Sequence, residues 1–237
     1  MKLEVFENAD SVARAAAASI AAEARSAIAA RGRFVMAVSG GHTPWIMLGA
    51  LAAEDVPWES VHVCQVDERV APDGHADRNL THLHESLLQH APLRPAQIHA
   101  MRVEMADLQT AAREYALVLR EIAGSPPVID LVHLGLGPDG HTASLVPGDA
   151  ALDVTDLDVA TTGVYQGRRR MTLTYPTLNR ARRVLWVVTG SEKGEMLRRL
   201  RNGDVSIPAG RVRREQGVVL ADRAAAGQFN AEFNRGK

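Results

Sequence analysis

The sequence predicts an α/β protein in which a mostly parallel β-sheet is covered by helices on both faces. Short continuous apolar runs alternate with longer helical segments along the chain, as they do in βαβ units. The run FVMAV at residues 34–38 has no alternating polar positions, which is typical of a strand buried on both faces. Several such runs end in polar, mostly glycine-rich loops. We expect a single domain over residues 1–237.

The first elements follow this alternation in order. Residues 3–6 predict a strand, and the Ala-rich residues 11–30 predict a helix that ends at Gly32. After the FVMAV strand, Thr43 and Pro44 are typical of the N-cap and the first position of a helix that runs to about residue 53.

The second part of the chain repeats the pattern. The predicted elements are a strand at 61–66, a polar loop at 67–78, a helix at 79–88, strands at 129–134, 184–188 and 217–220, and a helix that ends near residue 200. The loops after the carboxyl ends of parallel strands lie at one edge of the sheet, where ligands bind. We therefore expect the loops at Ser39, Asp67, Gly135 and Gly190 to share one cleft.

Composition excludes several classes of protein. The 27 Lys and Arg residues balance 28 Asp and Glu residues, so the chain is neither a histone-like polycation nor an acidic tail. Apolar residues make up 46% of the chain, which suffices for an ordinary core. The lone Cys64 cannot form an internal disulfide, and the acidic N-terminus does not resemble a signal peptide. We expect a cytoplasmic protein that neither enters nor binds a membrane.

The motif SGGHTP at residues 39–44 lies between a predicted strand and a predicted helix. Free backbone N–H groups and the positive end of the helix dipole favour a phosphate there, and Gly40 and Gly41 would let the anion approach the backbone. The alternative is an ordinary tight turn. The motif matches neither the dinucleotide fingerprint nor the P-loop, so we expect no dinucleotide site and no ATP site.

The motif QVDER places Asp67 and Arg69 just after a buried strand. Side chains alternate along a strand, so both residues can point to the same side. They are either part of a binding site or a surface ion pair of little energetic value.

The loop GLGPDGHTAS at residues 135–144 is the densest motif. Its three glycines and one proline predict a sharply folded loop that presents His141 beside Asp139. A neighbouring carboxylate can fix the tautomer of a histidine and raise its basicity, which a general base requires.

Two other roles for these residue types carry less support. His75, His82, His84 and His90 are close in sequence, but they have no HExxH pattern or i, i+4 pair, and we expect no metal site. A Ser-His-Asp triad that uses Ser39 or Ser144 is conceivable, yet neither serine lies in a GxSxG elbow.

Residues 166–215 are strongly basic, with twelve arginines and Lys193 against four acidic residues. Most of these cations fit a solvated face, and one or two fit phosphate ligands. Interleaved aromatic residues for base stacking are missing, so we expect an anionic metabolite rather than a nucleic acid as the partner.

Taken in order, the motifs SGGHTP, VDER and DGHTASL, followed by RMTLT at 170–174, GSEK at 190–193 and IPA at 207–209, resemble those of the 6-phosphogluconolactonase family. This family belongs to the glucosamine-6-phosphate isomerase/6-phosphogluconolactonase superfamily. The resemblance implies a Rossmann-like α/β fold without a dinucleotide site. It also implies hydrolysis of 6-phospho-D-glucono-1,5-lactone to 6-phosphogluconate, in the oxidative pentose phosphate pathway, without a metal or organic cofactor.

The resemblance also implies roles for individual residues. His141 would be the general base that takes a proton from the attacking water. Asp67 and Arg69 would line the lactone pocket, and Arg69 or a backbone N–H of residues 135–140 would stabilise the oxyanion. The implied ligands of the 6-phosphate are Gly40, Gly41, Thr43, Arg170 and Lys193.

The sequence leaves two alternative functions open. In glucosamine-6-phosphate deaminases of the same superfamily a catalytic Glu follows the histidine by five residues, and here that position is Val146. A non-catalytic sugar-phosphate-sensing domain would need a DNA-binding segment, and the first predicted strand begins at residue 3. His42 and Val146 also differ from the residues that are usual in lactonases, Ser and Phe. The sequence predicts no particular protein partner.

Overall fold

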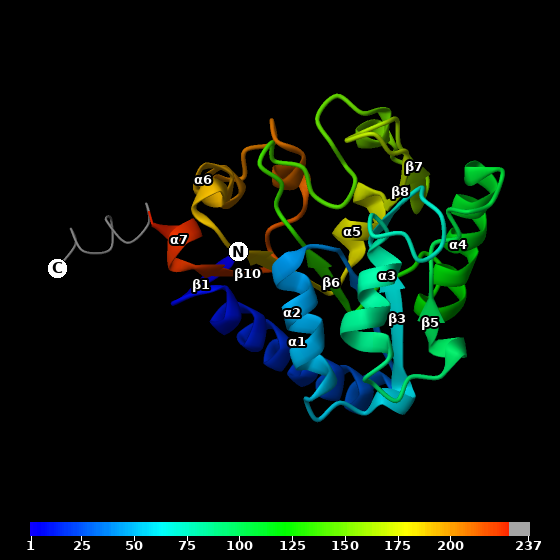
Figure 1. The fold of residues 1–237 in the computed structure, drawn as a ribbon, viewed down its shortest axis with the longest axis horizontal. Coiled ribbons are helices and arrows are strands. Elements are labelled where there is room, and N and C mark those ends of the chain that lie inside the picture. The colour runs from blue at the N-terminus through cyan, green and yellow to red at the C-terminus, as the bar shows by residue number, and fades with distance from the viewer. Residues whose placement is uncertain (228–237) are drawn as a thin grey trace.

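The computed structural model describes residues 1–227, and its centre is a seven-stranded β-sheet (Figure 1). The strands are β1 (Lys2–Phe6), β2 (Phe34–Val38), β3 (Val61–Gln65), β5 (Ile98–His99), β6 (Leu131–Leu134), β9 (Arg183–Val188) and β10 (Gly217–Asp222). They lie in the order β1–β10–β9–β6–β2–β3–β5, and every neighbouring pair is parallel. The predicted parallel sheet is confirmed.

Helices cover both faces of this sheet, as predicted. The α-helices are α1 (Ala9–Arg31), α2 (His42–Ala52), α3 (Asn79–Leu83), α4 (Leu108–Ala123), α5 (Tyr175–Arg180), α6 (Gly194–Asn202) and α7 (Arg223–Ala226). A π-helical turn, His84–Leu88, extends α3, and short 3₁₀ turns occur at Trp58–Ser60, Pro95–Gln97, Ala150–Asp153, Ser191–Lys193 and Pro208–Arg211. Within residues 1–227 no helix is long and apolar enough to cross a membrane.

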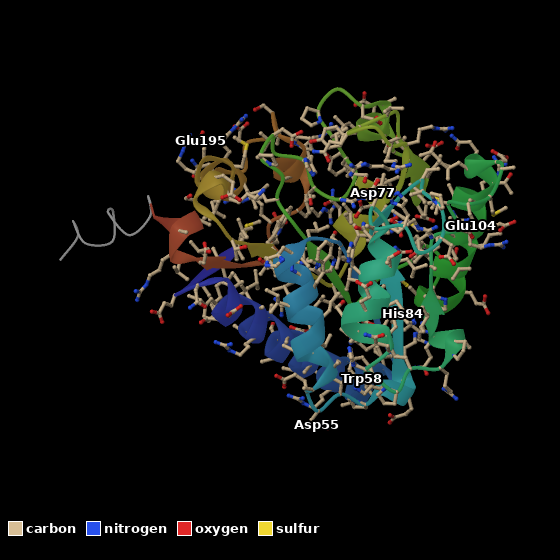
Figure 2. The ribbon with its side chains drawn as sticks, in the orientation of Figure 1. Asp55, Trp58, Asp77, His84, Glu104 and Glu195 are labelled. Atoms are coloured by element: carbon tan, nitrogen blue, oxygen red, sulfur yellow. The ribbon has the colours of Figure 1, made fainter. Side chains whose placement is uncertain are left out.

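Alternate side chains of the central strands pack into two separate apolar cores on opposite faces of the sheet. In β2, Phe34 and Met36 pack into the core that α1 and α2 cover. Val35 and Ala37 point to the opposite face and pack into the core that includes α4 and α6. A strand buried on both faces must be apolar at every position, which explains the unbroken FVMAV run. Charged side chains such as Glu104 and Glu195 lie at the periphery (Figure 2).

Glycine and asparagine set the helix ends. Asn8 caps α1 by accepting a hydrogen bond from the Ser11 N–H at 2.9 Å, and Gly32 ends the helix with φ 74°. The predicted N-cap of α2 was wrong: Gly41 occupies that position and the helix begins at His42. Thr43 instead lies in the first turn of the helix, and its Oγ1 contacts Thr189 Oγ1 at 2.7 Å rather than capping a backbone N–H.

A second, antiparallel sheet stands beside the carboxyl edge of the first. It consists of β4 (Asp67–Arg69), β8 (Arg170–Leu173) and β7 (Val159–Thr161), so the first three residues of the predicted 67–78 loop form a strand instead. Val66 joins the sheets, since its N–H donates to Val38 O and its carbonyl accepts from the Leu173 N–H. This junction brings β8 to the end of β3.

Cys64 lies in β3 and is fully buried among apolar side chains. Burial raises the pKa of its thiol to about 12, and a hydrogen bond with Tyr115 offsets only part of that effect. The thiol is therefore protonated and inaccessible in the folded protein.

Candidate active site

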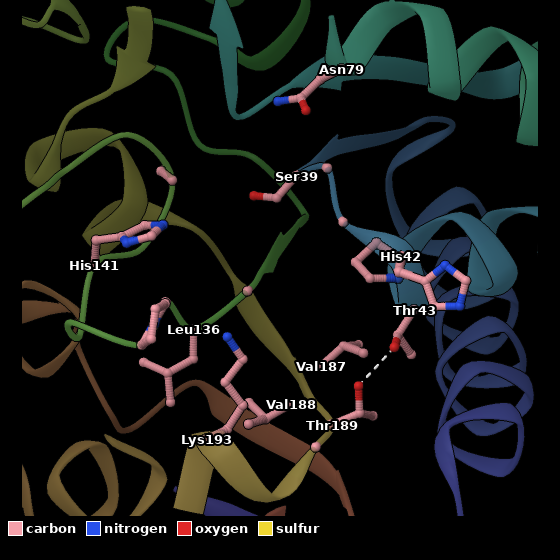
Figure 3. Close-up of a pocket in the computed structure, with 18 of the residues that line it drawn as sticks. Ser39, His42, Thr43, Asn79, Leu136, His141, Val187, Val188, Thr189 and Lys193 are labelled. Carbon is pink, nitrogen blue, oxygen red and sulfur yellow. Dashed lines mark hydrogen bonds between the residues drawn. The ribbon is translucent and has the colours of Figure 1, made fainter. Parts of the chain in front are cut away.

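A cavity of about 560 Å³ opens at the carboxyl edge of the main sheet (Figure 3). The loops after β2, β6 and β9 contribute its walls together with residues of β4 and β8. All eight site residues expected from the sequence line it: Gly40, Gly41, Thr43, Asp67, Arg69, His141, Arg170 and Lys193. The expectation that Ser39, Asp67, Gly135 and Gly190 share one cleft is confirmed, although Asp67 lies in β4 and not in a loop.

His141 reaches into this cavity from the loop after β6, across from His42 and Thr43 (Figure 3). Its Nδ1 lies 2.5 Å from Asp139 Oδ1, and its backbone N–H donates to the same oxygen at 3.1 Å. Burial acts to raise the pKa of Asp139, but the hydrogen bonds from His141 and Tyr165 outweigh it and leave that pKa lowered. In the neutral form of the imidazole, a charged Asp139 favours the tautomer whose Nδ1 carries the proton, and the lone pair is then on Nε2.

The glycines of this loop make room for the imidazole. A Cβ atom on Gly137 would lie 2.1 Å from His141 Nδ1, and one on Gly140, where φ is 81°, would lie 2.7 Å from Ile207 Cβ. The Gly137 N–H also donates to the His141 carbonyl at 2.8 Å. The loop folds sharply, as predicted, and its fold packs the His141 ring closely against the backbone at Gly137.

Asp67 is buried and held in place by Ser144, whose hydroxyl donates to its Oδ2 at 2.6 Å. The hydroxyl of Ser144 is therefore bonded to Asp67 and not to His141. Within residues 1–227, Asp67 forms no ion pair with Arg69. The surface-pair alternative for these two residues was wrong.

Glu68 is a fully buried carboxylate that sequence analysis did not single out. It accepts hydrogen bonds from the backbone N–H groups of Arg69, Asn79 and Leu80, and Arg78 Nε lies 3.3 Å away. It thus caps the start of α3 and ties that helix to β4. The negative charge of Glu68 is satisfied internally, which leaves Arg69 free to face the cavity.

Arg69 and Arg170 lie opposite each other in the β4–β8 register. Arg170 is only 4% exposed, and its Nη2 makes long hydrogen bonds of 3.4 and 3.3 Å to Tyr165 O and Gln166 Oε1. Burial and the positive charge of Arg69 lower the pKa of Arg170. Neither arginine forms an ion pair with any described carboxylate. Two adjacent cations at a cavity wall, neither in an ion pair with a described carboxylate, favour an anionic ligand.

A second group of anion-binding elements lies across the cavity. The Gly40–Gly41 turn leads into the N-terminus of α2, where the first N–H groups have no acceptor within the helix. Thr43 Oγ1 lies 2.7 Å from Thr189 Oγ1, which links this turn to the loop after β9 (Figure 3). Lys193, from the 3₁₀ turn of that loop, points into the same space.

Asn79 and Ser39 were not predicted as binding residues, yet both line the cavity. Asn79 Nδ2 donates to Asp67 O at 2.9 Å, and a Cβ on Gly40 would lie 2.0 Å from Asn79 Oδ1. The closeness of Gly40 to Asn79 depends on the packing of α3 against the turn, which no local motif specifies. A larger residue at position 40 would therefore displace the Asn79 side chain, which comes from a distant segment of the chain.

No cluster of three or more His, Cys, Asp or Glu side chains within residues 1–227 could hold a metal ion. His62 and His99 form a pair with Nδ1 and Nε2 3.0 Å apart, but they lie on β3 and β5 and not in the cavity. Val146 is buried and carries no acid group at the position where a deaminase would need one.

Comparison with known proteins agrees with this arrangement. A family model described as glucosamine-6-phosphate isomerases/6-phosphogluconolactonase matches residues 7–221. A 6-phosphogluconolactonase from Mycobacterium bovis is 34% identical over 241 residues, which cover 96% of this chain and 98% of that protein. One from Synechocystis sp. is 41% identical over 166 residues, covering 68% of this chain and 69% of its own length.

A solved structure shows the same fold. The crystal structure of 6-phosphogluconolactonase from Thermotoga maritima superimposes with a TM-score of 0.82 at 26% identity, and the match covers 93% of this chain and 98% of that one. The order of motifs, the two-sided parallel sheet and the match over residues 7–221 lead to one conclusion: the chain belongs to the glucosamine-6-phosphate isomerase/6-phosphogluconolactonase family.

Proposed function

We propose that the protein hydrolyses 6-phospho-D-glucono-1,5-lactone to 6-phosphogluconate, a step of the oxidative pentose phosphate pathway. The observation that carries the proposal is the pairing of His141 with Asp139 at a cavity wall that also presents Arg69 and Arg170, neither of which forms an ion pair with a carboxylate of residues 1–227. The relatives named 6-phosphogluconolactonase support it.

In the proposed reaction His141 is the general base. Its Nε2 takes a proton from a water molecule while the water oxygen attacks the C1 carbonyl of the lactone. The tetrahedral intermediate then breaks its bond between C1 and the ring oxygen, and the imidazolium returns the proton to that oxygen. Asp139 holds the ring through Nδ1 and stabilises the imidazolium. The reaction consumes one water and needs no covalent nucleophile, metal or organic cofactor.

In the proposed reaction Arg69 is one candidate to stabilise the negative charge that develops on the carbonyl oxygen. Its Nη1 donates to Asp77 O at 2.8 Å, which fixes the guanidinium, while its Nε has no partner among the described residues. A fixed donor costs little reorganisation when the charge appears. Backbone N–H groups of residues 135–140 are the other candidates. Asp67, held by Ser144, can accept hydrogen bonds from the sugar hydroxyls.

Gly40, Gly41, Thr43, Arg170 and Lys193 form the proposed phosphate site. Backbone N–H groups at the start of α2 and two cationic side chains supply the donors that a phosphate dianion requires. Binding the phosphate would hold the lactone carbonyl in place relative to His141, which lowers the entropic cost of the reaction.

The direct test is to generate the phosphorylated lactone in situ and to follow its disappearance with and without the purified protein. Ammonia release from glucosamine 6-phosphate is measured in parallel. We expect faster lactone loss and no ammonia. Ammonia release would overturn the lactonase assignment in favour of a deaminase, and tight binding of the sugar phosphate with neither reaction would favour a sensing domain.

A further inference from the structure

Tyr165 lies at the start of a tight two-residue turn outside the family motifs. Its N–H donates to Arg168 O at 2.9 Å, and the Arg168 N–H donates back to Tyr165 O at 3.2 Å. Gln166 and Gly167 between them have φ of 50° and 78°, the left-handed pair of a type I′ turn. Since glutamine rarely adopts a positive φ, the turn holds a strained residue next to the cavity.

The hydroxyl of Tyr165 faces the His141–Asp139 pair. The hydroxyl donates to Asp139 Oδ2 at 3.0 Å and lies 3.4 Å from His141 Nδ1. The rings of Tyr165 and His141 pack edge to face, with their centres 5.4 Å apart. His141 occupies Oδ1 of the same carboxylate. With one donor on each oxygen, the carboxylate cannot rotate without losing a hydrogen bond.

The rest of Tyr165 supports the cation of the proposed phosphate site. The Arg170 guanidinium carbon lies 5.0 Å from the centre of the tyrosine ring, and Arg170 Nη2 donates to the Tyr165 carbonyl at 3.4 Å. One residue therefore contacts both the proposed base and the proposed phosphate ligand, although its side chain is not among those that line the cavity.

We infer that Tyr165 is a positioning residue, which fixes Asp139 and His141 through its hydroxyl and Arg170 through its ring. The inference deepens the proposed lactonase function and rests on it. Burial, followed by the hydrogen bond and charge of Asp139, raises the pKa of Tyr165, so the hydroxyl keeps its proton as a donor should.

Tyr165→Phe removes only the hydroxyl. We expect kcat to fall about three- to tenfold, the size of one lost hydrogen bond, with KM unchanged. Tyr165→Leu removes the ring as well, and we expect a similar loss in kcat together with a severalfold higher KM, because Arg170 loses its aromatic support. Equal kcat for Tyr165→Phe and the unaltered protein, or a rise in its KM instead, would overturn the inference.

Tyr175→Phe is the matched control. The Tyr175 hydroxyl donates to Pro208 O at 2.9 Å, and Arg211 lies 4.7 Å over its ring, so the residue has the same two kinds of contact away from the cavity. We expect unchanged kcat and KM. A comparable loss of kcat in this control would show that the effect of Tyr165→Phe is general and would contradict a positioning role.

A substrate-free measurement separates this inference from the proposed function. In ¹⁵N-histidine spectra, with the His141 signal assigned by its absence in His141→Gln, we expect the Nδ1-protonated tautomer in the unaltered protein and a mixture of tautomers in Tyr165→Phe. An identical tautomer in both proteins would overturn positioning by Tyr165. Failure of the unaltered protein to hydrolyse the lactone would instead overturn the function, and the spectra would still decide the role of Tyr165.

Discussion

The environment of His141 leads to the first prediction at the scale of single residues. Replacing His141 with Gln removes the proposed base while keeping a polar side chain of similar size. We expect kcat for the phosphorylated lactone to fall roughly 10²- to 10⁴-fold. Thermal unfolding and circular dichroism should be unchanged.

His84→Gln serves as the control for this variant, because His84 is exposed on the π-helical turn and does not line the cavity. It should turn over at the normal rate. Near-normal turnover by His141→Gln would eliminate the general-base assignment and require another acceptor for the proton of the water.

Replacing Arg170 should weaken substrate binding without lowering the free energy of unfolding. The residue is a buried cation beside Arg69 and has no described carboxylate partner. Arg170→Met should raise KM for the phosphorylated lactone about tenfold or more, the value of a lost charged hydrogen bond. It should also leave the free energy of unfolding unchanged or raise it by about 1 kcal/mol, since a buried charge is replaced by an apolar chain.

Comparing the phosphorylated lactone with unphosphorylated gluconolactone isolates the phosphate contribution. If Arg170 binds phosphate, only the phosphorylated substrate should bind more weakly to the variant. Lys193→Met, which removes a partly exposed cation, should share the effect on KM and leave stability as it was. Equal weakening for both lactones would place Arg170 at the sugar instead of the phosphate.

The sequence predicted the site residues that lie in short motifs with recognisable chemistry. It did not predict the residues whose roles depend on tertiary contacts. His141 and Asp139 stand two residues apart in a glycine-rich loop, so their contact could be predicted. Ser144 bonds Asp67 across 77 positions of sequence. Tyr165 lies in a segment with no motif, and only the I′ turn brings its hydroxyl to Asp139.

At the scale of elements, the edge of the main sheet contains a pH-sensitive pair. His62 on β3 and His99 on β5 lie with Nδ1 and Nε2 3.0 Å apart, a hydrogen bond in which one ring must accept. Burial and the neighbouring His62 lower the pKa of His99 from 6.5 to about 4. Burial, Arg33 and Arg94 lower the pKa of His62 as well.

The lowered pKa values of His62 and His99 determine how the free energy of unfolding changes with pH. The unfolded chain takes up protons near pH 6.5, while the folded protein resists them, so the free energy of unfolding falls as the pH drops from about 6.5 towards 4. Each proton contributes at most about 1.4 kcal/mol per pH unit, and solvent screening at these partly exposed rings reduces that value. Above pH 7 both states are neutral and the effect disappears.

Urea unfolding at pH 7 and pH 5 tests this expectation. The difference between the two pH values should be smaller for His99→Gln than for the unaltered protein. His133 is also held neutral, with its pKa lowered to about 3 by burial, but it contributes equally to both proteins. An equal pH difference in the two proteins would contradict the assigned role of the β3–β5 pair.

Most helices and strands were predictable because the local sequence pattern favours the same structure as the tertiary packing. The exceptions have identifiable causes. The FVMAV strand and the Gly32 stop of α1 needed no tertiary information. The predicted start of α2 was wrong, since the Thr43 hydroxyl contacts Thr189 on the loop after β9 and does not cap the helix. The second sheet was missed because β4 and β7 have only three residues each, and they form strands only by pairing with β8.

At the scale of the whole molecule, the two cores share one sheet. Phe34 and Met36 belong to one core and Val35 and Ala37 to the other, so β2 cannot leave one core without leaving both. We therefore propose that the chain is a single domain. Calorimetry should show one transition whose van't Hoff enthalpy equals the calorimetric enthalpy, roughly 170 kcal/mol near 60 °C for a chain of this length. A van't Hoff value near half of the calorimetric one would indicate two independent units.

The burial of Cys64 makes the native protein inert towards thiol reagents, although the chain contains a cysteine. A second cysteine introduced on the surface would thus be the sole target of a maleimide dye, without any need to remove the first. Val164 is 71% exposed and precedes Tyr165. A fluorophore attached there would report, in real time and without a coupled assay, how the Tyr165 turn responds when a sugar phosphate enters the cavity.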